Sequence, residues 1–196
     1  NAGADRVLTL DLHAGQIQGF FDIPTDNLYS SPIFIKDIKK NLKIKNTTFI
    51  SPDVGGITKA REIASQLKSD IAIIDKRRSE PGKSEVMNVI GDIKNKTCII
   101  IDDIVDSAGT LCNAAKVMKK KGAKYITAYI THGVFSGNAI AKISKSPIEK
   151  LIVTDSIEPQ ESIINSTKIN IVTVAPLLGE AIKRICEEKS VSVLFD

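Results

Sequence analysis

The apolar run Cys98–Ile101 constrains the fold more than any other part of the sequence. The run is continuous and rich in β-branched residues, whereas a strand with one face in water would alternate apolar and polar residues. It therefore fits a strand that is covered on both faces, as in a parallel sheet. Apolar residues at helical spacing follow between Leu111 and Met118, and the cationic turn Lys119–Lys121 before Gly122 is typical of a helix end. The stretch thus predicts a strand, a loop and a helix.

Hydrophobic periodicity predicts similar units along the rest of the chain. Further strands are expected at Val7–His13, Thr47–Ser51, Asp70–Asp75, Tyr125–Thr131, Lys150–Asp155 and Asn170–Ala175. Helices are expected at Ile33–Leu42, around Ala60–Leu67, at Gly137–Ser144 and around Leu178–Ile185. Pro24–Pro32 is rich in turn residues and is a candidate domain junction. The alternation of strands and helices predicts an α/β fold with a doubly wound, mainly parallel sheet flanked by helices.

The composition is that of an ordinary globular protein. With 196 residues, 42% of them hydrophobic and 26% charged, the chain is long enough for one full α/β domain and does not have the composition of a disordered protein. No apolar run reaches the length of a membrane span. The net charge of +4 is mild and the lysines are spread out, which argues against nucleic-acid binding. Cys98, Cys112 and Cys186 lie far apart at positions that look buried, as is typical of a reducing compartment.

Three carboxylates, those of Asp102, Asp103 and Asp106, follow the central apolar run, and Asp102 and Asp103 are expected to mark the carboxyl end of the predicted strand. In a partly dry pocket they would repel one another, so hydroxyl donors, a cation or a hydrated divalent metal must hold them. A ribose 5-phosphate would supply hydroxyl donors to the carboxylates. The structural alternative is that Asp102 and Asp103 only cap the strand and Asp106 caps the helix that follows.

The loop Val105–Thr110 leads from the predicted strand into the predicted helix. Unpaired N–H groups and the positive end of the helix dipole favour a bound phosphate at such a junction. Gly109 would let the backbone approach the phosphate closely, and Ser107 and Thr110 would add hydroxyl donors. The loop is therefore a candidate site for the phosphate of a sugar phosphate.

Three other segments have both a functional and a structural interpretation. His13 follows a predicted strand, where it is either a metal ligand or an ordinary hydrogen-bonded residue. The adjacent Gly55 and Gly56 either cradle an anion with their N–H groups or only form a tight turn. The basic segment Lys76–Glu85 is predicted to be a mobile loop. Such loops are usually solvated surface. This one, however, follows the end of a predicted strand, where its positive charge could serve phosphoryl transfer. Val86–Asp92 reads as the arm that returns from it.

The order hydrophobic-Asp-Asp-x-x-Asp-[Ser/Thr]-x-Gly-Thr in Ile101–Thr110 resembles the ribose 5-phosphate loop of the type I phosphoribosyltransferase family. Three further stretches, Asp11–Phe21, Ser51–Gly56 and Lys76–Glu85, narrow the resemblance to the ribose-phosphate pyrophosphokinases. The resemblance covers essentially the whole chain and implies a type I phosphoribosyltransferase-like fold. It implies a transferase that moves the diphosphoryl group of ATP to the C1 hydroxyl of ribose 5-phosphate. The products would be AMP and phosphoribosyl pyrophosphate for nucleotide biosynthesis, with Mg2+ as cofactor.

The resemblance also implies a role for each matching residue. Binding of the sugar phosphate would fall to Asp102, Asp103, Asp106, Ser107, Ala108, Gly109 and Thr110. The pyrophosphate loop would consist of Asp53, Val54, Gly55 and Gly56, and the metal would be held by His13 and Asp53. Lys76 and Arg78 match the two catalytic cations of the family's flexible loop.

The family's domain layout gives an expected division of the chain. Residues 1–30 would be the C-terminal remnant of an N-terminal domain, residues 31–186 the catalytic domain, and residues 187–196 a C-terminal strand that packs back on the N-terminal domain. Because the first residue is not methionine, we expect a fragment, and we expect it to be poorly active alone. The family further implies a cytoplasmic homo-oligomer, from dimer to hexamer, regulated by phosphate or ADP. Neither nucleic acid nor membrane is an expected partner.

Two other functions are compatible with parts of the sequence. A phosphoribosyltransferase would share the Asp-Asp loop, but nothing resembles a base-specificity hood, and the His13 and Lys76–Arg78 motifs point away from it. A non-catalytic regulatory paralogue of the synthetase would have no need for intact Lys76, Arg78, His13 and Asp53. The synthetase activity is therefore the leading hypothesis.

Overall fold

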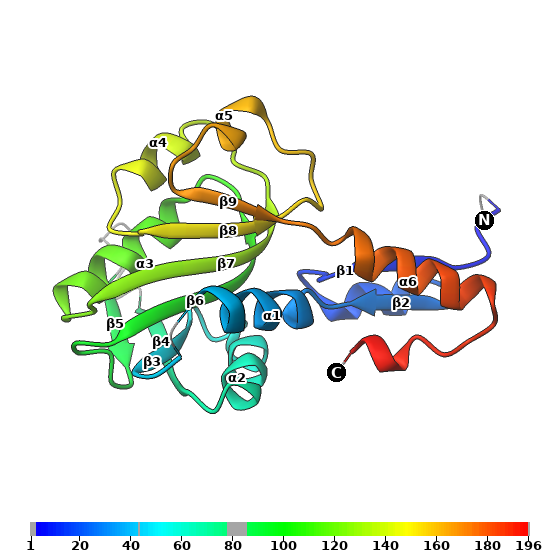
Figure 1. Cartoon of the computed structure of the whole chain (residues 1–196), viewed down its shortest axis with the longest axis horizontal. Coiled ribbons are helices and arrows are strands. Elements are labelled where there is room, and N and C mark those ends of the chain that lie inside the picture. The colour runs from blue at the N-terminus through cyan, green and yellow to red at the C-terminus, as the bar shows by residue number, and fades with distance from the viewer. Residues whose placement is uncertain (1–2, 43, 78–85, 196) are drawn as a thin grey trace.

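The computed structural model describes residues 3–42, 44–77 and 86–195. Its centre is a seven-stranded sheet in the order β5-β4-β3-β6-β7-β8-β9 (Figure 1). The strands are β3 (Thr47–Ser51), β4 (Asp70–Arg77), β5 (Val86–Ile90), β6 (Thr97–Val105), β7 (Tyr125–Gly133), β8 (Lys150–Thr154) and β9 (Ile169–Val172). Neighbouring strands are parallel except for β4 and β5, which are antiparallel.

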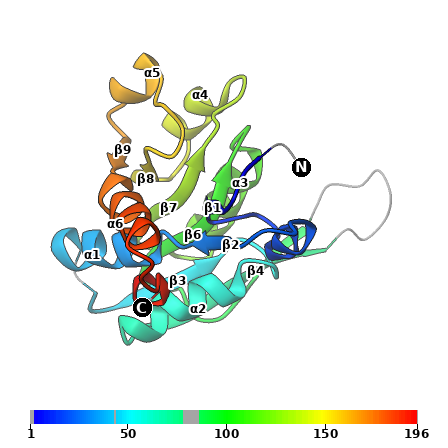
Figure 2. The ribbon, with the colours of Figure 1, turned by 90° about the vertical axis from the view of Figure 1, so that its right-hand side faces the viewer.

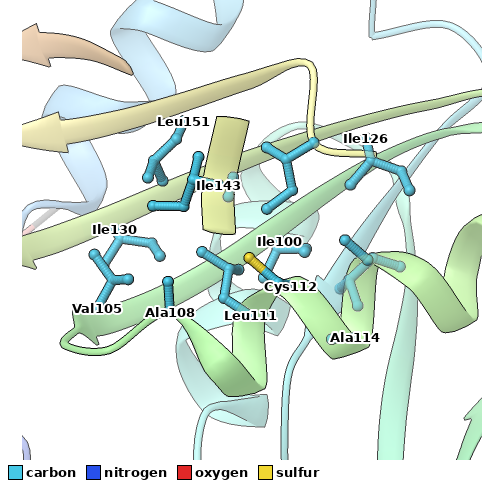
Figure 3. Packing of buried hydrophobic residues seen from close by; sticks show 14 of the residues in the cluster. Ile100, Val105, Ala108, Leu111, Cys112, Ala114, Ile126, Ile130, Ile143 and Leu151 are labelled. Carbon is cyan, nitrogen blue, oxygen red and sulfur yellow. The ribbon is translucent and has the colours of Figure 1, made fainter. Parts of the chain in front are cut away.

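Helices cover both faces of this sheet. One face carries α1 (Ser31–Asn41) and α2 (Ile57–Gln66), and the other carries α3 (Gly109–Lys120), α4 (Ala139–Ser144) and α5 (Glu161–Ile164). Each side has its own hydrophobic cluster, and Figure 3 shows the cluster in which Leu111 and Ala114 of α3 pack against Ile100 and Ile130 of the sheet. The predicted doubly wound, mainly parallel α/β fold is confirmed.

The continuous apolar run of β6 is explained by these two clusters. Ile99 and Ile101 pack on the side of α1 and α2, whereas Cys98 and Ile100 pack on the side of α3, and all four side chains are fully buried. Because successive side chains of a strand point to opposite faces, a strand covered on both faces needs apolar residues at every position. The central prediction from the sequence is therefore confirmed.

A second, smaller part of the structure stands beside the sheet. Strands β1 (Val7–Leu10) and β2 (Thr25–Leu28) form a separate parallel pair. In Figure 1 this pair and α6 (Ala175–Cys186) extend together away from the large sheet, and Figure 2 looks at the structure from that end. The short 3-10 helix η1 (Gly15–Phe20) lies between β1 and β2 in the chain. Near the C-terminus, the ring of Phe195 lies 6.1 Å from that of Tyr29, edge to face.

Two expectations for this smaller part are wrong, and a third segment contains a strand that was not predicted. The first strand ends at Leu10 rather than His13, because Asp11 adopts a φ of 45° that breaks the extended backbone. The turn-rich segment Pro24–Pro32 contains strand β2, whose polar residues pair with β1. Instead of a C-terminal strand over Ser190–Phe195, the chain forms the 3-10 helix η2 (Ser192–Leu194).

Burial of the cysteines agrees with the expectation in two of three cases. Cys98 and Cys112 are buried, and burial raises the pKa of the Cys98 thiol to about 12. Cys186, at the end of α6, is exposed, so the expectation that it is a core residue is wrong. None of the helices in the described ranges is long and apolar enough to cross a lipid bilayer.

Candidate active site

Asp102 and Asp103 lie within strand β6 and not at its end. The strand continues to Val105, and its pairing with β7 includes Asp102 opposite Ile130 and Ile104 opposite His132. The expectation that the two carboxylates mark the carboxyl end of the strand is therefore wrong by a few residues. The alternative that they only cap the strand is also contradicted, because capping would require them to lie at the strand end.

The two adjacent carboxylates have different environments. The N–H group of Asp103 donates to Oδ1 of Asp102 at 3.0 Å. Burial, and next the neighbouring charge of Asp103, raise the pKa of Asp102 to about 7. Asp103 instead has a partner, since Nδ1 of His13 lies 2.7 Å from its Oδ2. The hydrogen bond to Asp103 and its charge raise the pKa of His13 above its ordinary value.

The contact between His13 and Asp103 joins two predicted site motifs that are 90 residues apart in the sequence. The His13 side chain is 78% exposed and that of Asp103 is 19% exposed, so the imidazole reaches over the carboxylate from the solvent side. A neighbouring carboxylate favours the protonated form of an imidazole. Two of the predicted site segments therefore meet in the structure, through a contact that the sequence had not predicted.

The loop Asp53–Gly56 closes on itself. The N–H group of Gly56 donates to Oδ1 of Asp53 at 3.0 Å, and Oγ of Ser51 donates to the carbonyl oxygen of Asp53 at 2.6 Å. Gly56 has a φ of −80°, and a Cβ there would lie 3.0 Å from Oγ of Ser51. The loop is thus a tight turn that needs glycine for space. The expectation that the N–H groups of both glycines are free for an anion is wrong for Gly56, whose N–H is bound to Asp53.

The loop before α3 has the geometry of an anion site. Ala108 has a φ of 58°, in the left-handed region, and is followed by the right-handed helix that begins at Gly109. A left-handed residue next to right-handed ones turns successive N–H groups toward one point. The first N–H groups of a helix have no acceptor within it, and no side chain caps this helix. Asp106 therefore does not cap the helix, contrary to the structural alternative.

The side chains of this loop face solvent. Asp106, Ser107 and Thr110 are exposed, and Ala108 is buried. From helix α4, Nζ of Lys142 donates to the carbonyl oxygen of Ser107 at 3.0 Å. The loop thus offers N–H groups and hydroxyl groups on one accessible surface.

A cavity of about 850 Å³ lies between the β1–β2 segment, the start of α2 and strand β6. Predicted site residues among those that line it are His13, Asp53, Gly55, Gly56, Asp102 and Asp103. The loop Asp106–Thr110 and Val54 are not among its lining residues. The structure thus brings the His13, Asp53 and Asp102–Asp103 motifs together in one cavity and leaves the loop Asp106–Thr110 outside its lining.

The cavity is acidic and suits a hard cation. Its lining includes five carboxylates, of Asp11, Asp53, Glu62, Asp102 and Asp103. In the part of the chain that the structure describes, no three His, Cys, Asp or Glu side chains are grouped closely enough to hold a metal alone. Mg2+ is commonly bound by one or two carboxylates together with water and substrate phosphates, so this donor set fits it.

The predicted catalytic cations are only partly covered by the structure. The backbone of Lys76 lies in β4, paired with Met87 of β5. Arg78 and the rest of residues 78–85 lie outside the described residues. The returning arm predicted at Val86–Asp92 is confirmed as strand β5, which runs antiparallel to β4.

Several cavity residues were not predicted as site residues. Asp11, Lys59 and Glu62 line the cavity, and burial raises the pKa of Glu62. The only local signal for Lys59 is its place three residues after Gly56, at the start of an amphipathic helix. Its partners come from distant parts of the chain, so periodicity could not reveal its role.

The fold and the site define a class: a doubly wound α/β protein with an acidic ligand cavity beside its central parallel strand and a candidate anion loop at a helix N-terminus. A family model described as "Phosphoribosyl synthetase-associated domain" matches residues 78–196. The chain belongs to this family. The phosphoribosyltransferase-type loop and the synthetase-like motifs of the sequence agree with that membership.

Similar proteins support the same family. The chain is 59% identical to "Ribose-phosphate pyrophosphokinase" of Rhizobium meliloti (strain 1021) and 58% identical to the protein of that name from Agrobacterium fabrum, over 100% of this chain and 63% of each relative. The crystal structure of phosphoribosylpyrophosphate synthetase from Mycobacterium smegmatis is similar, with a TM-score of 0.87 and 33% identity over 95% of this chain and 60% of that one. The chain thus spans just under two thirds of these relatives, and its predicted resemblance is confirmed.

Proposed function

We propose that this protein is a ribose-phosphate diphosphokinase, which transfers the diphosphoryl group of ATP to the C1 hydroxyl of ribose 5-phosphate. The observation that carries the proposal is the meeting of three motifs at one acidic cavity. His13 lies 2.7 Å from Asp103, and Asp53 lines the same cavity. A reaction between a nucleotide and a pentose phosphate needs its nucleotide, metal and ribose groups within reach of one another.

The proposed roles follow the chemistry of each group. The 5-phosphate would bind to the N–H groups at the start of α3, and hydroxyl groups of the ribose would bind to Asp102 and Asp103. With a pKa of about 7, the carboxyl group of Asp102 can accept a hydrogen bond from a sugar hydroxyl or donate one to it near neutral pH. The alkoxide or hydroxyl at C1 would then lie on the side of the cavity that faces His13 and Asp53.

The diphosphate end of the reaction would use the loop Asp53–Gly56. Asp53 and His13 would hold Mg2+, which supplies charge neutralisation for the transferring group. In this proposal the N–H group of Gly56 would exchange its bond to Asp53 for one to a phosphate oxygen, freeing the Asp53 carboxylate for the metal. Lys76 and Arg78 would stabilise the charge that develops in the transition state.

An assay of AMP formation from ATP, ribose 5-phosphate and Mg2+ tests the proposal. We expect AMP to form only when all three are present, and Asp103→Asn to reduce its formation. The experiment needs the protein at the length of its relatives, because this chain spans 63% of them. Absence of AMP in the presence of all three would contradict the proposed activity.

Calorimetric titration separates the two other functions from this one. A phosphoribosyltransferase would bind phosphoribosyl pyrophosphate and a base but would not use ATP. A regulatory paralogue would bind ligands without turnover. Ribose 5-phosphate binding together with ATP-dependent turnover would support the synthetase.

The proposal extends to partners and organisation on the support of the family resemblance. We infer a cytoplasmic homo-oligomer, from dimer to hexamer, that responds to phosphate or ADP. We also propose the division into residues 1–30, 31–186 and 187–196, with the first and last segments belonging to an N-terminal domain. The ring contact between Tyr29 and Phe195 supports this division, because it joins the first segment to the last. Light scattering of the protein as it leaves a size-exclusion column measures the oligomeric state.

A further inference from the structure

Asp11 is a buried carboxylate, 3% exposed, directly after the end of β1. Its Oδ2 accepts hydrogen bonds from Oγ of Ser30 at 2.5 Å and from Oγ1 of Thr131 at 2.6 Å, and Nζ of Lys59 lies 2.7 Å away. We call Asp11, Ser30, Lys59 and Thr131 the Asp11 clamp. The four residues belong to four different places: the end of β1, the start of α1, the first turn of α2, and β7.

Lys59 is committed to the clamp. Besides its ion pair with Asp11, its Nζ donates to Oγ1 of Thr131 at 3.0 Å and to Oγ of Ser30 at 3.3 Å. The three partner oxygens also lie within 2.8 Å of one another, so they gather on one side of the ammonium group. Its Nζ also lies 5.7 Å from the centre of the Phe34 ring. Lys59 lines the cavity as well.

The charge of Asp11 is maintained by its partners. Burial alone would raise the pKa of Asp11, but the charge of Lys59 and the hydrogen bonds of the clamp outweigh it, so the pKa is lowered. Because a buried charge without its partner is costly, removing the Lys59 charge should destabilise the turn at Asp11 before other parts of the structure.

The backbone at Asp11 is held in an unfavourable conformation. Its φ of 45° lies in the left-handed region, which disfavours residues other than glycine. The N–H group of Asp11 donates to the carbonyl oxygen of Leu28 at 2.8 Å, and Nε2 of His132 lies 3.0 Å from the carbonyl oxygen of Leu10. Such a conformation persists only when its surroundings determine it, and it often marks a functional site. The clamp and His132 supply those surroundings.

The Asp11 clamp fixes the position of the nearby His13. Thr131 of β7 lies between Ile130, which pairs with Asp102, and His132, which pairs with Ile104, and so it stands beside Asp103 on β6. Asp11 is thus anchored next to Asp103, and His13, two residues further along, reaches the Asp103 carboxylate. Lys59, in the first turn of α2, lies three residues after Gly56 of the predicted pyrophosphate loop.

We propose that Asp11 and Lys59 are positioning residues, which hold the His13 turn in register with Asp103 on β6 and with the Asp53–Gly56 loop at the start of α2. In this proposal they act through His13 and the loop. The effect of the Asp11 clamp on catalysis rests on the proposed function, but its effect on the position of His13 does not.

Amide hydrogen exchange measured by NMR tests the positioning. The reporters are the N–H group of Asp11, bonded to Leu28, and that of Leu12, bonded to Oδ1 of Asn27 at 3.1 Å. In Lys59→Met we expect both amides to exchange about tenfold faster or more, because the turn opens locally. Lys59→Arg keeps the charge and should keep most of the protection.

Lys96→Met is the matched control. Nζ of Lys96 lies 2.8 Å from Oδ2 of Asp70, so this variant also breaks a lysine–aspartate pair, but one away from the cavity. It should leave the Asp11 and Leu12 amides unchanged. Unchanged protection of these amides in folded Lys59→Met would overturn the proposal, and so would an equal loss of protection across β6 and β7, since that indicates a purely structural role.

A double variant keeps the test valid if Lys59→Met does not fold. Asp11→Asn with Lys59→Met removes both charges, so no unpaired charge stays buried. We expect it to fold and to show the same local loss of protection at Leu12. Full protection of Leu12 in this variant would contradict the proposal.

Nucleotide binding gives a second readout in the protein at the length of its relatives. Titration with ATP and Mg2+ should show an affinity about tenfold lower for Lys59→Met than for the unmodified protein, because His13 is displaced, and Lys59→Arg should restore it. Equal affinities of the Met variant and the unmodified protein would overturn the link to the site. If the unmodified protein binds no ATP, the proposed function fails, while hydrogen exchange still tests the clamp.

Discussion

Asp102 and Asp103 are neighbours in the same strand, yet their surroundings differ. Oδ2 of Asp103 lies 2.7 Å from Nδ1 of the His13 imidazole. Burial and the adjacent negative charge oppose the ionisation of Asp102, so its pKa rises to about 7. A carboxyl group that titrates near neutral pH can either bind a cation or donate a hydrogen bond to a sugar.

The raised pKa of Asp102 predicts a pH dependence of stability. Because its folded-state pKa lies above the unfolded value, this group stabilises the fold at low pH and loses that contribution as the pH rises toward 7. In Asp102→Asn this loss is absent, so the free energy of unfolding of the variant relative to the unmodified protein should rise by about 2 kcal/mol between pH 5.5 and pH 8. Urea unfolding at both pH values measures the difference.

Asp106→Asn is the control for this prediction, because Asp106 is an exposed carboxylate in the loop that directly follows β6. Its free energy of unfolding should follow that of the unmodified protein at both pH values. Parallel pH curves for Asp102→Asn and the unmodified protein would show that Asp102 is ionised normally.

Among the elements, α3 combines a structural and a proposed binding role. Its buried residues, Leu111, Ala114 and Ala115 among them, pack on the sheet, which fixes the direction of the helix axis and so the place of its N-terminus. Its cationic last turn, Lys119 and Lys120, suits the negative end of the dipole. The helix thus holds the proposed phosphate site at its N-terminus beside β6.

Gly109→Val tests the phosphate loop at the start of this helix. A Cβ at Gly109 would lie 3.8 Å from Oγ of Ser107, an ordinary contact, so the variant should fold. Its side chain would stand over the N–H groups, and ribose 5-phosphate affinity measured by calorimetry should fall about tenfold or more. Unchanged affinity would mean that the phosphate binds elsewhere.

The basic segment that begins in β4 gives a second prediction at the scale of elements. Lys76→Ala and Arg78→Ala should each lower kcat far more than they raise KM, because charges that act in the transition state contribute little to ground-state binding. Loss of one such charge commonly reduces the rate on the order of 100-fold. A change in KM alone, measured in the AMP assay, would assign both residues to substrate binding.

At the scale of the whole molecule, stability depends on the sheet that is covered on both faces. Ile100 is fully buried in the α3 cluster, whereas Ile104 of the same strand is 40% exposed. Ile100→Ala should lower the free energy of unfolding by about 2–5 kcal/mol, since it leaves a cavity in the core. Ile104→Ala should cost clearly less, and similar losses of the two variants in urea unfolding would contradict this account of the core.

Much of the large sheet could be predicted because its information is local. The apolar run of β6 and the helical spacing of α2 and α3 each reflect how their own faces are covered. Strand β2, with the polar sequence Thr-Asp-Asn-Leu, carries no such record and exists because it pairs with β1. Residues 192–194 form a 3-10 helix although their sequence resembles a strand, since no strand of the described chain pairs with them.

The candidate site likewise has features that the local sequence predicts and features that depend on the tertiary structure. The sequence by itself determined the family, and it predicted which segments carry the chemistry, because clusters of carboxylates, glycines and cations next to apolar runs form recognisable local patterns. Only the tertiary structure decided that Asp103 lies against His13, that Gly56 is bound by Asp53, and that Asp11 is held by Lys59 and Thr131. The physical reason is that periodicity reports the burial of a residue's own neighbourhood, whereas contacts across 90 or 120 residues depend on how the finished elements pack.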